Sequence, residues 1–147
     1  MTAQAPSPAT SDALPGSIAA LRAAGLRVST ARRVVLTALA AAPGPATAEE
    51  IASGFDGAAP QSDLASVYRN LYTFQQLGIV NQLPSGRGAG RYVLALRASA
   101  GYFLCARCDT TDQLAPGALD ALRRAVSEHA AYAFTPLAIV GLCADCR

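Results

Sequence analysis

The chain has 147 residues, of which 52% are hydrophobic and 15% charged, and its formal net charge is +2. This composition supports a packed core and excludes a wholly disordered chain, and no apolar run approaches the ~20 residues that a membrane-spanning helix needs. Residues 1–16 lack the charged start and apolar centre of a secretory signal, so we expect a flexible tail and a cytoplasmic protein with no membrane partner. Paired cysteines in that compartment indicate metal or redox sites before disulfides.

Two short helices are predicted after the tail. The first covers residues 17–24 and ends at Gly25, because glycine readily takes the left-handed conformation that a helix C-terminus often needs. Ser29 or Thr30 can cap the second helix, which runs to about residue 42 and stops before a proline-rich stretch. Four arginines lie in or beside these two helices, namely Arg22, Arg27, Arg32 and Arg33.

Two further helices follow. Thr47 precedes a helix over residues 48–55, and Glu50 stands three positions later, as a capping box requires. The next helix begins after Ser62 and ends at Gly78. Its apolar residues recur every three or four positions, so they are expected to share one face that packs on the earlier helices. These residues are Val67, Leu71, Phe74 and Leu77.

Residues 79–96 contain two short β-like runs around a glycine-rich turn, which predicts a hairpin. Helices closed by a hairpin, in this order, are typical of a winged helix-turn-helix, although small helical domains with a hairpin also serve other purposes. We therefore expect residues 17–96 to form a winged-helix DNA-binding domain. The fold class is α+β, with a small α/β dimerisation domain over residues 97–147.

The second domain is expected to contain two strands, a helix and a last strand. The helix over residues 117–131 would turn Leu119, Leu122, Val126 and Ala130 inward. The apolar run of residues 136–143 has strand length and suits a strand buried on both faces. Strands of this kind leave a sheet edge to be paired, which favours a homodimer.

All four cysteines occur in two matched pairs, Cys105 with Cys108 and Cys143 with Cys146. Each C-x-x-C can present two thiolates to one tetrahedral ion, so the two pairs predict one structural zinc ion per chain. Buried cysteines acting as small hydrophobes would not be expected in matched pairs. A thiol-disulfide site is the other alternative, but no helix follows the second pair to activate a thiolate.

The two halves together resemble the ferric and zinc uptake regulator family of bacterial repressors. GLRVSTARRVVLTAL resembles the family's first basic segment, DLASVYRNLYTFQQLGIV its recognition helix and RYVL the end of its wing. CARC and LAIVGLCADC resemble the paired cysteines of its structural zinc site. The resemblance covers roughly residues 17–147 and implies a dimer that binds palindromic operators.

One departure from the family is large. Members usually carry a His-rich stretch before the first cysteine pair, which helps to bind a regulatory metal, whereas this chain has Ser99-Ala100-Gly101-Tyr102. Gln113 and Thr135 stand where the family commonly has Glu and His. The single histidine, His129, cannot build the usual sensing site, which needs several His and carboxylate ligands. A degenerate sensor using His129 with Glu128 or Asp112 is the sharper alternative.

In a helix-turn-helix, the N-terminal part of the second helix meets base edges in the major groove. Arginines of the first two helices would anchor phosphates, and those of the wing would follow the backbone or the minor groove. The expected DNA-contacting residues are Arg22, Arg27, Arg32, Ser62, Ser66, Tyr68, Arg69, Asn70, Arg87 and Arg91.

The function expected from the sequence is a sequence-specific transcription regulator, a repressor that binds double-stranded DNA at an inverted repeat. A regulator whose four-cysteine zinc site senses thiol oxidation is an alternative, as is the degenerate metal sensor. An enzyme is not expected, because the chain has no phosphate-binding loop or paired carboxylates and would need its only histidine for a Ser-His-Asp set.

Overall fold

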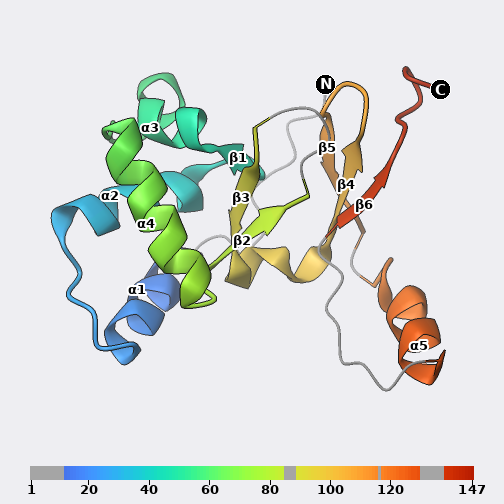
Figure 1. Cartoon of the computed structure of the whole chain (residues 1–147), viewed down its shortest axis with the longest axis horizontal. Helices are drawn as coiled ribbons and strands as arrows, with labels where there is room; N and C mark the ends of the chain where they lie inside the picture. The colour runs from blue at the N-terminus through green and yellow to red at the C-terminus, as the bar shows by residue number, and fades with distance from the viewer. Residues whose placement is uncertain (1–11, 85–88, 116, 130–137) are drawn as a thin grey trace.

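The structure is a computed structural model that describes residues 12–84, 89–115, 117–129 and 138–147. Four helices and a first sheet occupy one end of the molecule, and a second sheet with the last helix occupies the other (Figure 1). The first sheet has the strand order β1-β3-β2 and the second the order β5-β4-β6. Within the described ranges, no helix has the length and apolar character needed to cross a lipid bilayer.

Helix α1 (Ala13–Ala23) begins four residues before the predicted start, so the expected tail over residues 1–16 is wrong for residues 13–16. Pro15 is tolerated there because the first turn of a helix needs no N–H donors. The Ser17 hydroxyl donates to the carbonyl of Ala13 over 2.7 Å, and Ile18 and Leu21 are buried. The rest of the predicted tail, residues 1–11, lies outside the described residues.

Helices α2 (Thr30–Ala41) and α3 (Ala48–Gly57) start where their capping residues predict. The Ser29 side chain accepts a hydrogen bond from the backbone N–H of Arg32, which selects Ser29 over the alternative cap. Thr47 and Glu50 form the reciprocal capping box, with distances of 3.2 and 2.9 Å.

Helix α4 (Leu64–Gln76) is capped by Asp63, whose carboxylate accepts from the N–H of Ser66 over 2.8 Å. Three of its predicted core residues are buried, namely Val67, Leu71 and Phe74. Leu77 is 38% exposed, so its predicted core position is wrong. The reason is local: Leu77 is the C-cap, and the chain turns at Gly78, where φ is 69°.

The predicted hairpin consists of β2 (Val80–Leu83) and β3 (Arg91–Leu94), which pair antiparallel. A two-residue strand, β1 (Ala46–Thr47), pairs with the other edge of β3 and was not predicted. Helices α1–α4 pack over this sheet around one apolar core, which includes Leu21, Leu36, Leu39, Ile51, Leu71, Phe74 and Leu94.

The 3-10 helix η2 (Ala95–Ala100) connects the first sheet to the second. In the second sheet, β4 (Tyr102–Cys105) pairs antiparallel with β5 (Thr111–Gln113) and parallel with β6 (Ala138–Gly141). Strand β6 is therefore an edge strand, and Ile139 and Val140 are exposed. The expectation that this strand is buried on both faces is wrong for the single chain, because the consecutive residues Ile139 and Val140 point to opposite faces of the sheet and both are exposed.

Helix α5 (Asp120–His129) stands apart from the second sheet (Figure 1) and has no buried residue. Leu119, immediately before the helix, is buried as predicted, but Leu122 is 43% exposed and Val126 is only partly covered. The inward face predicted for α5 is therefore wrong within one chain. Ala130 lies outside the described residues.

Candidate metal centre and nucleic-acid interface

The four cysteines converge at one end of the second sheet. Cys105 ends β4 and Cys108 lies on the turn after it, while Cys143 and Cys146 follow β6. Because Cys105 is in register with Gly141 in the parallel β4–β6 pair, the chain after β6 returns beside the first cysteine pair. All four sulfur atoms lie within 4.8 Å of one another.

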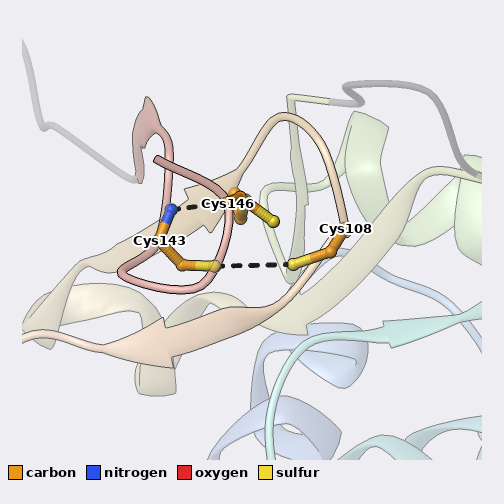
Figure 2. Close-up of side chains that lie close together, drawn as sticks. Cys108, Cys143 and Cys146 are labelled. Atoms are coloured by element: carbon orange, nitrogen blue, oxygen red, sulfur yellow. Dashed lines mark hydrogen bonds between the residues drawn. The ribbon is translucent and has the colours of Figure 1, made fainter.

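The spacing of the sulfur atoms fits a tetrahedral metal ion. A zinc ion binds thiolates at about 2.3 Å, which places the sulfurs of a regular tetrahedron about 3.8 Å apart. The Sγ atoms of Cys108 and Cys143 are 3.7 Å apart and point toward one another (Figure 2). This separation is far longer than the ~2.05 Å of a disulfide bond, so the four thiols form a set of potential metal ligands.

Hydrogen bonds tune these thiols unequally. The backbone N–H of Cys143 donates to Sγ of Cys105 over 3.4 Å, and such backbone donors lower the pKa of Cys105 to about 6. The Thr110 hydroxyl, 3.0 Å from Sγ of Cys108, lowers the pKa of that thiol. The pKa of Cys146 is raised to about 12, mainly by the hydrogen bond of this thiol with Cys143 and secondly by burial.

The four cysteines differ in solvent exposure. Cys105 is buried, whereas Cys108 is exposed and lines a cavity of about 460 Å³. The cavity lies between the two halves of the chain. Pro43, Glu50 and Arg91 line it from the first half, and Cys108, Asp109 and Thr110 line it from the second.

Helix α4 carries four of the five predicted reading residues, and the fifth, Ser62, lies just before the helix. Tyr68 and Arg69 are exposed, while Ser62, Ser66 and Asn70 are partly covered. The Asn70 amide donates to the carbonyl of Ser66 over 2.9 Å, so Asn70 is held along its own helix. The opposite face is buried in the core, which fixes the orientation of the exposed one.

The predicted phosphate-anchoring arginines are spread over the first half. Arg22 and Arg27 are exposed, and the Arg32 guanidinium donates to the carbonyl of Arg27 over 2.7 Å. Arg87 lies outside the described residues. Arg91 is placed elsewhere: its guanidinium lies 3.6 Å from the Glu50 carboxylate and 3.4 Å from the carbonyl of Pro45. Arg91 therefore faces the cavity between the halves.

Two residues of this surface were not expected from the sequence. Tyr72 is 66% exposed, and its spacing of four from Tyr68 could have placed it on the same helix face. The carboxylate of Glu49 in α3 accepts a hydrogen bond from the Tyr68 hydroxyl. No sequence signal indicates this contact, because the two residues are 19 positions apart.

His129 lies at the end of α5, exposed, with Nδ1 3.1 Å from the carbonyl of Ala125. Among the described residues, the four cysteines form the one group of at least three His, Cys, Asp or Glu side chains that could share a metal ion. In this conformation, His129 thus makes a contact within its own helix.

Comparisons with known proteins agree with this arrangement. The sequence model of the ferric uptake regulator family matches residues 23–139. The chain is 29% identical over 136 residues to the peroxide-responsive repressor PerR of Staphylococcus saprophyticus, covering 91% of each chain. The fold is similar to that of the Helicobacter pylori ferric uptake regulator, with a TM-score of 0.71, 19% identity and 93% of each chain covered. It is also similar to the Pseudomonas aeruginosa ferric uptake regulator with manganese, with a TM-score of 0.69, 22% identity and coverage of 87% and 98%.

Proposed function

The chain belongs to the ferric uptake regulator family of DNA-binding transcription regulators, and on this premise we propose that it is a dimeric repressor with one structural zinc ion. The observation that carries the proposal is the outward face of α4. This face presents Tyr68, Arg69 and Tyr72 to solvent while Val67 and Phe74 anchor the helix in the core. A second helix exposed in this way can enter a DNA major groove.

The proposed DNA contacts divide into two kinds. The start of α4 reads base edges, and arginines of the first two helices bind phosphates. Arg91 stays in the set expected from the sequence, although its guanidinium also lies 3.6 Å from the Glu50 carboxylate and 3.4 Å from the carbonyl of Pro45. The remaining residues are Arg22, Arg27, Arg32, Ser62, Ser66, Tyr68, Arg69, Asn70 and, in the wing, Arg87.

We assign zinc to the four-cysteine cluster. Thiolate ligands select thiophilic ions, and four of them complete a tetrahedral shell with no open position for catalysis. Cys105, Cys108, Cys143 and Cys146 would hold the ion, which would then cross-link β4 to the residues that follow β6. The Arg107 side chain, which donates to the carbonyl of Cys146, steadies the segment after β6.

The second half, residues 97–147, is the proposed dimerisation domain. Its edge strand β6 and helix α5 expose large apolar side chains, including Leu122, Ile139, Val140 and Leu142. An uncovered strand edge with apolar neighbours is readily paired by a second copy. A two-fold axis through this contact would give two α4 helices that read an inverted repeat.

We further propose that no conventional regulatory metal is needed for DNA binding. His129 is engaged within α5, and the four cysteines are committed to the structural ion. Zinc alone would then keep the dimer competent to bind its operator. Blocking of polymerase at that site would account for repression.

A redox response is a second candidate function, favoured by the exposure of Cys108 beside the cavity and its 3.7 Å separation from Cys143. Hydrogen peroxide would oxidise the two thiols to a disulfide, with two electrons passing to peroxide and two molecules of water formed. The metal would be released as its ligands are lost. Native mass spectrometry before and after mild peroxide separates this candidate from a purely structural site, for which zinc content and DNA affinity stay unchanged.

The test of the proposed function is a DNA-site selection. Purified, zinc-loaded protein is incubated with a random DNA pool, and the recovered duplexes are sequenced and titrated in gel shifts. An inverted repeat bound by a dimer is the expected result. Recovery of DNA without any common sequence would contradict a sequence-specific regulator.

A further inference from the structure

The side chain of Arg97 joins two parts of the chain that are far apart in sequence. Its guanidinium donates to the carbonyl of Leu39 over 3.2 Å and to the carbonyl of Ala42 over 2.8 Å. Both carbonyls lie at the C-terminal end of α2. Arg97 itself belongs to η2, the segment that connects the DNA-reading half to the half with the cysteines.

The end of α2 favours such a partner. The last carbonyls of a helix have no partner within the helix, and the helix dipole places partial negative charge there. A guanidinium carries several donors in a fixed, planar arrangement, so one side chain satisfies two carbonyls at once. The contact is partly buried, which reduces screening of this charge by solvent.

The same linker segment is held from the second half. The hydroxyl of Tyr102, in β4, donates to the backbone carbonyl of Arg97 over 3.3 Å. Tyr102 is only 3% exposed, and it forms a small core with Leu83 and Val93 of the hairpin, against which Ala138 of β6 packs. Arg97 therefore connects the linker to both halves. Its side chain bonds to the end of α2, and its backbone carbonyl accepts a hydrogen bond from Tyr102 in β4.

Elsewhere the two halves are separated by the cavity described above. It lies between the Pro43–Pro45 loop with Glu50 on one half and the Cys108–Thr111 turn on the other. Because this side is open, packing there does not determine the angle between the halves. The packing of Tyr102 on Leu83 and Val93, together with the hydrogen bonds of Arg97, remains to set it.

We propose that Arg97 is a positioning residue that locks the DNA-reading half at one orientation relative to the second half, through protein groups alone. The consequence for DNA rests on the proposed function: a dimer spans both half-sites of an inverted repeat only if both readers are held at the required angle. A single half-site makes no such demand.

The test compares Arg97→Ala with Arg124→Ala, which removes the same charge from the exposed face of α5. Small-angle X-ray scattering of the zinc-loaded dimer without DNA reports the angle between the halves. Titrations then compare the inverted repeat recovered by selection with a duplex that contains one half of it. For Arg97→Ala we expect a larger radius of gyration and binding to the inverted repeat weakened on the order of tenfold, since preorganisation is lost. Half-site binding should change by less than about twofold.

Arg124→Ala should match the wild type in both measurements. An Arg97→Ala dimer with an unchanged scattering profile and an unchanged ratio of the two affinities would overturn the proposal. Should Arg97→Ala lose its cooperative thermal transition, Tyr102→Phe removes the second contact of the linker by deleting one hydroxyl, and the same two readouts decide. Failure of the selection to yield any site would reject the proposed function, while scattering without DNA would still decide the role of Arg97.

Discussion

The hydroxyl of Tyr68 lies 3.3 Å from a carboxylate oxygen of Glu49, so α3 holds a side chain that projects from the proposed reading face of α4. Partial burial, together with the Glu49 carboxylate, raises the pKa of Tyr68. The contact places one negative charge beside a surface proposed to meet phosphates. We therefore expect Glu49, which lies outside the proposed reading helix, to affect the strength of DNA binding.

Glu49→Gln should strengthen DNA binding about two- to fivefold at low salt, because it keeps an acceptor for Tyr68 and removes repulsion from phosphates. Fluorescence anisotropy titrations at several KCl concentrations measure the effect, which should shrink as salt rises. Glu128→Gln, on the exposed face of α5, is the control for the change in net charge. Weaker binding of Glu49→Gln would show that this carboxylate instead supports the DNA contact.

Arg69→Ala should weaken binding to the selected site by about 1–3 kcal/mol if Arg69 reads a guanine, and should relax selectivity at one base pair. If Arg69 binds phosphate instead, affinity for all sequences falls alike and the salt slope decreases by about one. Competition gel shifts with single-base variants distinguish these results. Binding equal to that of the wild type would remove Arg69 from the proposed interface.

Cys143→Ser should lose the metal ion and loosen the second half, since structural zinc contributes about 10–16 kcal/mol of binding energy that appears as folding energy. Metal analysis should fall from one zinc per chain to near zero, and sedimentation should show loss of the dimer. Treatment of the wild type with a strong zinc chelator should reproduce both changes. A metal-free variant that remains a stable folded dimer would contradict a structural role for the ion.

Val140→Asp should break the dimer, because it places a charge on the apolar edge strand β6. Light scattering after gel filtration should give the mass of a monomer. Leu64→Asp, a comparable change at an exposed position outside the second sheet, should leave the mass of the dimer unchanged. Monomer formation by both variants, or by neither, would argue against β6 as the dimer contact.

Added Fe²⁺, Mn²⁺ or Ni²⁺ should leave the operator affinity of protein with one zinc per chain unchanged within about twofold, because one histidine cannot supply the usual nitrogen ligands. Gel-shift titrations with and without each ion measure this. Binding that strictly requires a second metal would establish a sensing site that uses other ligands.

The sequence by itself predicted the elements whose signals act over a few residues. The caps at Ser29 and Thr47, the apolar spacing of α4 and the two C-x-x-C pairs were each readable, because capping, helical periodicity and chelation by neighbouring cysteines are local. These signals were sufficient for the order of the helices and the hairpin, and the structure brings the four sulfur atoms together as the pairing suggested.

Only the tertiary structure decided the contacts between residues that are distant in the chain. Arg91 meets Glu50, Tyr68 meets Glu49 and Arg97 meets the end of α2 over separations of 19 to 58 positions, for which no periodicity or motif exists. The exposure of β6 and α5 was missed for a related reason. An apolar run predicts that a strand or helix is buried, but it does not indicate whether residues of the same chain or of a second copy bury it.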